Sequence, residues 1–181
     1  MENTTKVITG KDTRFSYVKL IEPSSLSKKY EANVLIPKSD KVTYNKMLKA
    51  IEVAKEIAKG KKWGGKIPPK LKSEGFQDGD EKYDSNGDPD AVYADHWYLV
   101  ARNKDLPFLC DKNRVVIEPK EVYSGCYGIA SVNFFGYEFE GSKGIGVGLN
   151  GIQFLRDGEP LGGGGGNAAN DFEEFDKADE V

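Results

Sequence analysis

Lysine and aromatic side chains are concentrated between residues 41 and 72. This stretch holds ten lysines and only two acidic residues, a net charge of +8. Trp63 lies within it, flanked by glycines and lysines. Single-stranded nucleic acid is bound by this combination, because ammonium groups neutralise phosphates and a flat ring stacks on an unpaired base. The residues expected to make these contacts are Lys59, Lys61, Lys62, Trp63 and Lys66. The alternative, a solvated helix face with Trp63 packed in the core, stays open.

A second group of aromatic residues lies in segments with the composition of strands. Side chains alternate between the two faces of a strand, which places Phe15, Tyr17 and Lys19 on one face. The same rule places Phe135 and Tyr137 with Asn133 on one face of a later strand, and Val132 and Phe134 on the other. We expect the nucleic-acid contacts of this group to come from Arg14, Phe15, Tyr17, Lys19, Tyr127, Phe135 and Tyr137. The alternative for each single ring is that it fills the core.

Metal-binding and catalytic patterns are weak. Oxygen-bearing side chains between Asp84 and Asp95 recur at the spacing of a twelve-residue calcium loop, but the position that needs glycine is Pro89. We therefore interpret this segment as an acidic surface loop, and calcium binding stays open as the lesser alternative. His96, Cys110 and Cys126 have no paired spacing typical of a zinc site. We expect no metal, no cofactor and no enzymatic activity.

The elements that would position these residues are mostly strands. Runs rich in β-branched and aromatic residues predict strands at residues 13–21, 30–36, 97–101, 114–117, 128–137 and 145–154. A helix is expected from residue 41 to 59, capped by Ser39 or Asp40, and residues 60–95 are expected to form long loops. Short strands with glycine-marked turns and one sizeable helix indicate a mainly β protein, an OB-fold-like small β-barrel.

Charge is divided unevenly along the chain. Residues 157–181 hold eight acidic residues and one basic residue, a net charge of −7, and residues 1–156 carry +4. Five consecutive glycines at 162–166 cannot bury enough apolar surface to offset their ordering entropy. We therefore expect one domain at 1–156, and a disordered glycine-rich linker and acidic tail at 157–181. The tail residues expected to dock on a partner are Asp171, Phe172, Glu173, Glu174, Phe175 and Asp176.

Several glycine-marked motifs together resemble a phage family of single-stranded DNA-binding proteins, formerly a domain of unknown function. These motifs are residues 9–11, 13–17, 123–128, 143–150 and 157–163. The resemblance covers nearly the whole chain. It implies an OB-fold, a role in phage DNA replication or recombination, and a functional acidic C-terminus.

The favoured hypothesis is sequence-independent binding of single-stranded DNA, with phage or host replication or recombination proteins as partners of the tail. The alternative is a replication or recombination adaptor that acts mainly through protein contacts of the tail. No stretch approaches the roughly 20 apolar residues of a membrane span, and the N-terminus lacks a signal peptide's apolar core. We expect a cytoplasmic protein in the host cell with no membrane partner; a homodimer stays open.

Overall fold

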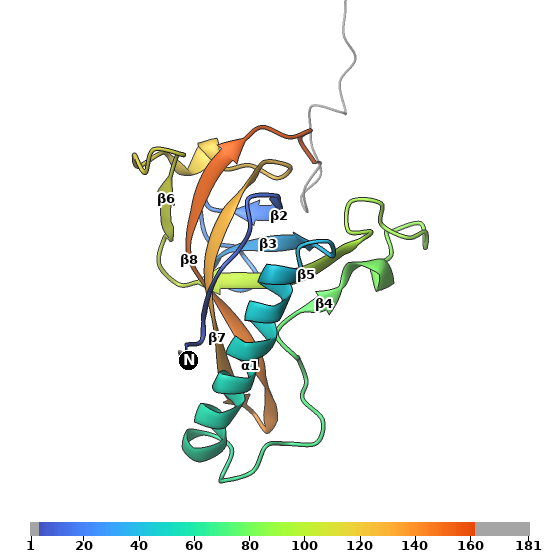
Figure 1. Ribbon diagram of the computed structural model, residues 1–181, viewed down its shortest axis with the longest axis vertical. Helices are drawn as coiled ribbons and strands as arrows, with labels where there is room; N and C mark the ends of the chain where they lie inside the picture. The colour runs from blue at the N-terminus through green and yellow to red at the C-terminus, as the bar shows by residue number, and fades with distance from the viewer. Residues whose placement is uncertain (1–3, 162–181) are drawn as a thin grey trace, which may run out of the picture.

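The computed structural model describes residues 4–161 (Figure 1). Strands dominate it, and one long helix, α1 (Lys41–Lys61), lies beside them. The strands are β1 (Lys6–Ile8), β2 (Thr13–Lys19), β3 (Tyr30–Pro37), β4 (Gln77–Asp78), β5 (His96–Asn103), β6 (Phe108–Cys110), β7 (Tyr127–Phe139) and β8 (Ser142–Arg156). Two short 3-10 helices, η1 (Gly79–Glu81) and η2 (Pro119–Glu121), complete the elements.

Five strands close into a barrel. β2 pairs with β3, β3 with β5, and β7 with both β8 and β2, all antiparallel, whereas β5 and β8 pair in parallel. The β5–β8 contact is a single residue pair, Arg102 with Gly148, and the β2–β7 contact comprises two pairs. The barrel is therefore partly open at these two seams, as in the OB-fold, and the predicted mainly β, OB-fold-like class is confirmed.

The helix α1 connects the second and third barrel strands, β3 and β5. It begins where predicted, because the Asp40 carboxylate accepts a hydrogen bond from the Thr43 backbone amide at 3.0 Å. Its buried face includes Met47, Ile51 and Ala54, and it packs mainly against β7. In Figure 1 the helix runs along the β7–β8 hairpin, which extends downward beyond the barrel.

The β7–β8 hairpin separates two sets of side chains, as the alternation predicts. Val132 and Phe134 are buried in the core, whereas Phe135 is 41% exposed and Tyr137 is half-buried. Phe135 and Tyr137 therefore lie on the hairpin face that is turned away from the core, which makes them available to a ligand.

One predicted strand, residues 114–117, is wrong. The Asp111 carboxylate accepts hydrogen bonds from the backbone amides of Asn113 and Val115, which bends the chain into a turn. Arg114 in this turn has a φ of 64°, outside the strand region. The strand next to this turn is β6, which pairs with β8, and residues 114–117 contribute only a single bridge from Val116 to Cys110.

Candidate nucleic-acid interface

A groove runs across the outer face of β3 and β5. It consists of two hollows of about 840 and 780 Å³ that share Gln77, Val100 and Arg102. The first hollow lies between residues 72–77 and the β7–β8 hairpin, and the second between β2 and the β2–β3 loop. In an OB-fold, the face of the second and third strands and the loops at its two ends bind oligonucleotides. We call the two hollows together the groove.

Aromatic rings line both hollows. Phe135, Tyr137 and Phe139 project into the first from the hairpin, and Tyr17 and Tyr98 line the second. Tyr17 is 36% exposed and Phe139 69% exposed. Rings that present a free face to solvent are the surfaces on which unpaired bases stack.

Glycines opposite the hairpin aromatics leave room for these rings over β8. Gly146 pairs with Phe135 and Gly144 with Tyr137 across the β7–β8 ladder. A Cβ at Gly146 would lie 2.6 Å from the Phe135 ring, and one at Gly144 would lie 2.6 Å from the Tyr137 hydroxyl. The missing side chains therefore leave room for Phe135 and Tyr137 to cover the β8 backbone and keep one ring face toward the groove.

Basic side chains accompany the rings. The groove is lined by Lys19, Lys29, Lys72, Lys82 and Arg102. Arg102 lies 3.7 Å from the Glu31 carboxylate and Lys82 lies 4.0 Å from that of Asp90. Within residues 4–161, Lys19, Lys29 and Lys72 have no carboxylate within 4.0 Å. These three ammonium groups are therefore free to neutralise phosphates.

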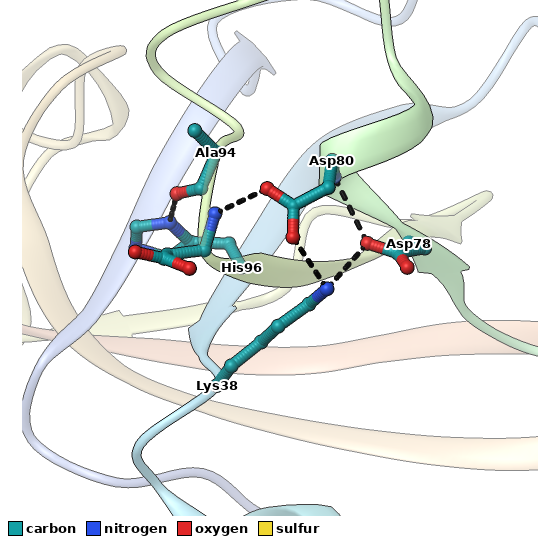
Figure 2. A network of polar contacts seen from close by, with 6 residues as sticks. Lys38, Asp78, Asp80, Ala94 and His96 are labelled. Carbon is teal, nitrogen blue, oxygen red and sulfur yellow. Dashed lines mark hydrogen bonds and ion pairs between the residues drawn. The ribbon is translucent and has the colours of Figure 1, made fainter.

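The wall formed by β4 and η1 is anchored by Lys38 (Figure 2). The Lys38 ammonium donates hydrogen bonds of 2.6 Å to both Asp78 and Asp80. These bonds raise the pKa of Lys38 and lower the pKa of each carboxyl group. The ammonium also lies 4.4 Å from the centre of the Trp97 ring. Because Gln77 lies next to Asp78 and lines both hollows, this anchor fixes the middle of the groove.

Tyr93 supports the groove from beneath. It is buried, and its ring packs edge-to-face against the Tyr98 ring, with 4.9 Å between the ring centres. Its hydroxyl accepts a 2.7 Å hydrogen bond from the Asn33 side-chain amide, and burial raises the pKa of Tyr93 to about 12. The Lys82 ammonium lies 4.9 Å from the Tyr93 ring and 5.7 Å from that of Tyr17. Tyr93 thus fixes Tyr98 while Lys82 links the Tyr93 and Tyr17 rings.

The prediction that Trp63 stacks on a base is wrong, and the alternative, Trp63 packed in the core, is what the structure shows. Its side chain is 3% exposed, and its indole Nε1 donates a 3.0 Å hydrogen bond to the Tyr137 carbonyl oxygen. Gly136 makes this burial possible, because a Cβ there would lie 2.2 Å from Ala58 and 3.0 Å from the Trp63 ring. Trp63 therefore fastens the end of α1 to β7 and presents no face to a base.

Phe15 is also in the core, fully buried, and the prediction that it shares a face with Tyr17 is wrong. A bulge shifts the β2–β3 register between Ser16 and Lys19, and Tyr17 has a φ of 48°. The bulge turns Tyr17 outward, so that Tyr17 and Lys19 line the second hollow.

Arg14 and Tyr127 lie together outside the two hollows. The Arg14 guanidinium lies 5.1 Å from the centre of the Tyr127 ring, and the Arg156 guanidinium lies 4.2 Å from it. Arg14 also donates hydrogen bonds of 3.0 Å to the carbonyl oxygens of Gly125 and Glu159. Both predicted residues therefore hold the segment that follows β8 against the barrel.

The lysines of the predicted basic stretch lie at the far end of the hairpin. Lys59, Lys61, Lys62 and Lys66 are exposed at the end of α1 and in the loop after it. Lys66 lines a hollow of about 410 Å³ together with Lys70 and, from the hairpin, Lys143. In Figure 1 this region is at the bottom of the molecule, below the barrel. These lysines are thus outside the groove, at the end where its first hollow reaches Phe139.

Several residues that line the groove were not among the predicted contacts. The residues missed were Lys29, Lys72, Phe76, Gln77, Lys82, Tyr98 and Arg102. A signal existed for two of them, since Tyr98 and Arg102 alternate with the buried Leu99 and Ala101 along β5. No local pattern places residues 72–77 beside β8; Ser73 is held there by hydrogen bonds with Ile145, one of them backbone to backbone at 3.0 Å.

The acidic loop after η1 is closed by its own hydrogen bonds. The Asp84 carboxylate accepts from the backbone amides of Asn86 and Asp88, at 2.9 and 3.1 Å. The backbone amide of Asp95, the last residue of the calcium-like spacing, donates a hydrogen bond to the Asp80 carboxylate.

Among residues 4–161, no three His, Cys, Asp or Glu side chains form a group that could hold a metal ion. In the same part of the chain, no helix is both long and apolar enough for a membrane span.

The fold and the groove define an OB-fold-like barrel with an open outer face, lined by aromatic rings and by both basic and acidic side chains. Comparison with known proteins identifies the family within this class of fold. The chain belongs to the family described as "Enterobacter phage Enc34, ssDNA-binding protein", whose model matches residues 5–181.

Relatives and solved structures agree with this membership. The chain is 34% identical to "Putative protein p50" of Acyrthosiphon pisum secondary endosymbiont phage 1, over 93% of this chain and 94% of that protein. It is similar to the single-stranded DNA-binding protein from bacteriophage Enc34 in complex with ssDNA, with 24% identity and a TM-score of 0.71 over 87% and 89% of the two chains. It also resembles gp2.5, a single-stranded DNA-binding protein of bacteriophage T7, with 12% identity and a TM-score of 0.58 over 94% and 96%. The two structural likenesses show the shared fold.

Proposed function

We propose that this protein binds single-stranded DNA in the groove, without sequence preference, during phage DNA replication or recombination. The observation that carries the proposal is the set of half-exposed rings, Tyr17 and Phe135 among them. They lie beside the ammonium groups of Lys19, Lys29 and Lys72, which have no carboxylate within 4.0 Å among residues 4–161. Stacking on rings requires an unpaired base, and every base has a π-face. Contacts to phosphates carry no base identity. The family's description and the Enc34 protein's complex with ssDNA support the same activity.

The groove residues have distinct roles in this proposal. Tyr17, Tyr98, Phe135 and Tyr137 stack on bases, and the groove lysines and Arg102 bind phosphates. Lys59, Lys61, Lys62 and Lys66 are secondary contacts for phosphates that pass the end of the hairpin. Support for their role is the hollow beside the hairpin turn, which is lined by Lys66, Lys70 and Lys143.

The proposed activity is binding without catalysis. Burial raises the pKa of Cys126 to about 11 and also raises that of Cys110, so both thiols are neutral at physiological pH and poor nucleophiles. The proposal includes no cofactor and no metal.

The acidic tail is proposed to recruit phage or host replication or recombination proteins. Its residues Asp171, Phe172, Glu173, Glu174, Phe175 and Asp176 lie outside the described residues. The support is chemical: two apolar rings among acids suit a partner with an apolar pocket and a basic rim. Action on phage DNA implies the host-cell cytoplasm, and a homodimer is compatible with this role.

Titration of a fluorescently labelled oligo-dT, followed by anisotropy, tests the proposal. Anisotropy is preferable to tryptophan emission because Trp63 is buried away from the groove. The wild-type protein should bind with micromolar or tighter affinity and Phe135→Ala should bind more weakly. Phe108→Ala is the matched control, since Phe108 is 57% exposed but lies on β6, outside the groove. No binding by the wild type would favour an adaptor that acts through protein contacts, and equal losses in the two variants would place the DNA elsewhere.

A further inference from the structure

The groove residue Tyr17 depends on a distorted backbone. A regular strand would turn Tyr17 to the same face as the buried Phe15, and the bulge in β2 turns it to the groove instead. Its φ of 48° is one that L-residues with a side chain rarely adopt. Such a conformation persists only where the surrounding structure holds it, so the residues that contact the bulge decide where the Tyr17 ring lies.

Ser124 contacts the bulge directly. The Val18 backbone amide, next to Tyr17, donates a 3.0 Å hydrogen bond to the Ser124 Oγ. The same turn, residues 123–126, pairs with Phe15 on the other side of Tyr17. The Gly125 amide donates a 2.8 Å hydrogen bond to the Phe15 carbonyl oxygen, and the Phe15 amide donates a 3.1 Å hydrogen bond to the Cys126 carbonyl oxygen. The turn therefore holds the backbone of β2 on both sides of Tyr17.

The segment that follows β8, residues 157–161, lies against the same turn. The Leu161 amide donates a 2.9 Å hydrogen bond to the Ser124 carbonyl oxygen, and the Tyr123 hydroxyl donates a 2.6 Å bond to Asp157. Contact is backbone to backbone at Gly125, where a Cβ would lie 2.1 Å from the Glu159 carbonyl oxygen. The base of the C-terminal tail thus packs on the turn that holds Tyr17.

We propose that Ser124 is a positioning residue for Tyr17, and that residues 157–161 keep Ser124 in place. The inference rests on the proposed function and adds a route from the tail to the groove that does not depend on the tail's charge. A partner that pulls residues 157–161 away from the turn releases the bulge and lowers the affinity of the groove for DNA.

A double-mutant cycle with labelled oligo-dT tests the role of Ser124. Ser124→Ala should weaken binding several-fold, and Ser124→Thr, which keeps the hydroxyl, should restore it. In a Tyr17→Ala background, Ser124→Ala should cause no further loss, because the side chain that Ser124 positions is gone. Losses that simply multiply in the double variant, or wild-type affinity in Ser124→Ala, would overturn the inference. If Tyr17→Ala itself binds as well as the wild type, the groove proposal fails instead. Melting temperatures identify any variant that loses affinity by unfolding.

Two truncations test the role of residues 157–161. One chain ends at Leu161 and carries Asp157→Asn and Glu159→Gln, so that it keeps the packed segment without its charges. The other chain ends at Arg156. Both lack the acidic tail and have the same net charge, so the two chains differ in the presence of the packed segment, residues 157–161. The shorter chain should bind oligo-dT several-fold more weakly; equal or tighter binding would show that residues 157–161 do not act on the groove.

Discussion

The Phe135 ring covers Gly146 across the β7–β8 ladder, in a space that a single methyl group would fill. A Cβ at Gly146 would lie 2.6 Å from the Cζ atom of Phe135, so the ring cannot lie flat over alanine. The open face of Phe135 is one of the largest exposed aromatic surfaces of the groove.

Gly146→Ala should therefore weaken DNA binding while leaving the fold intact, because the displaced ring no longer presents its face to the groove. The loss should approach but not exceed the about 1–3 kcal/mol typical of one base–aromatic stack. Oligo-dT anisotropy measures it. Gly60→Ala in α1 is the matched control, since a Cβ there meets nothing within 4 Å. Unchanged affinity in Gly146→Ala would remove Phe135 from the proposed contacts.

Trp63→Ala should destabilise the fold, because the indole is buried between α1 and β7 and donates a hydrogen bond to Tyr137. Removing a buried large aromatic side chain costs about 3–5 kcal/mol of unfolding free energy. Urea denaturation followed by circular dichroism measures the loss. The fraction that remains folded should bind oligo-dT as the wild type does; a stable variant with weak binding would contradict the burial of Trp63.

Salt should weaken DNA binding in proportion to the number of lysines that neutralise phosphates. For a single strand, the slope of log K against log salt is about −0.7 per phosphate neutralised. Lys72→Gln and Lys29→Gln should each make the slope shallower by about that amount. Lys112→Gln, an exposed lysine on the turn after β6, should leave it unchanged. A slope that does not respond to either groove lysine would exclude them as phosphate contacts.

Lys38→Gln should lower the melting temperature at neutral pH. The difference in melting temperature between the variant and the wild type should disappear in acid. The pKa values of Asp78 and Asp80 are lowered by Lys38, so the stability that the anchor contributes is present above the ordinary carboxyl pKa of 3.8. It is lost as pH falls through the lower pKa values of the folded state. At the alkaline end the raised pKa of Lys38 keeps the anchor intact up to its ordinary value of 10.5. Melting curves from pH 2 to 8 on both proteins test this; a constant difference at every pH would contradict it.

Deletion of residues 162–181 should tighten DNA binding at low salt, with a gain that shrinks as salt screens the tail. Lys19 lines the groove and also the hollow that contains Leu161, so the last described residue lies close to the DNA-binding surface. The glycine run at residues 162–166 predicts a flexible chain, and 20 residues of such a chain have a reach of about 22–27 Å. Anisotropy at several salt concentrations compares the deletion with the full chain. Equal affinity at all of them would show that the tail does not compete for the groove.

The sequence by itself determined the class of fold and the part of the site that depends on local alternation. β-branched runs, glycine-marked turns and the capped helix, predicted at residues 41–59 and observed at Lys41–Lys61, each depend on neighbouring residues. The two faces of β7 follow from the two-residue period of a strand. Phe135 and Tyr137 could therefore be assigned to an outer face from the sequence.

Tertiary structure alone decided that Trp63 and Phe15 are buried and that Tyr17 reaches the groove. Trp63 is flanked by lysines and glycines, yet it is buried because Gly136, 73 residues away in sequence, leaves space for it on β7. Phe15 and Tyr17 have the spacing of one face, but the bulge held by Ser124 separates them. Residues 72–77 become a wall of the groove through hydrogen bonds to β8. Each of these outcomes depends on contacts between segments far apart in the chain, and no local period or propensity carries that information.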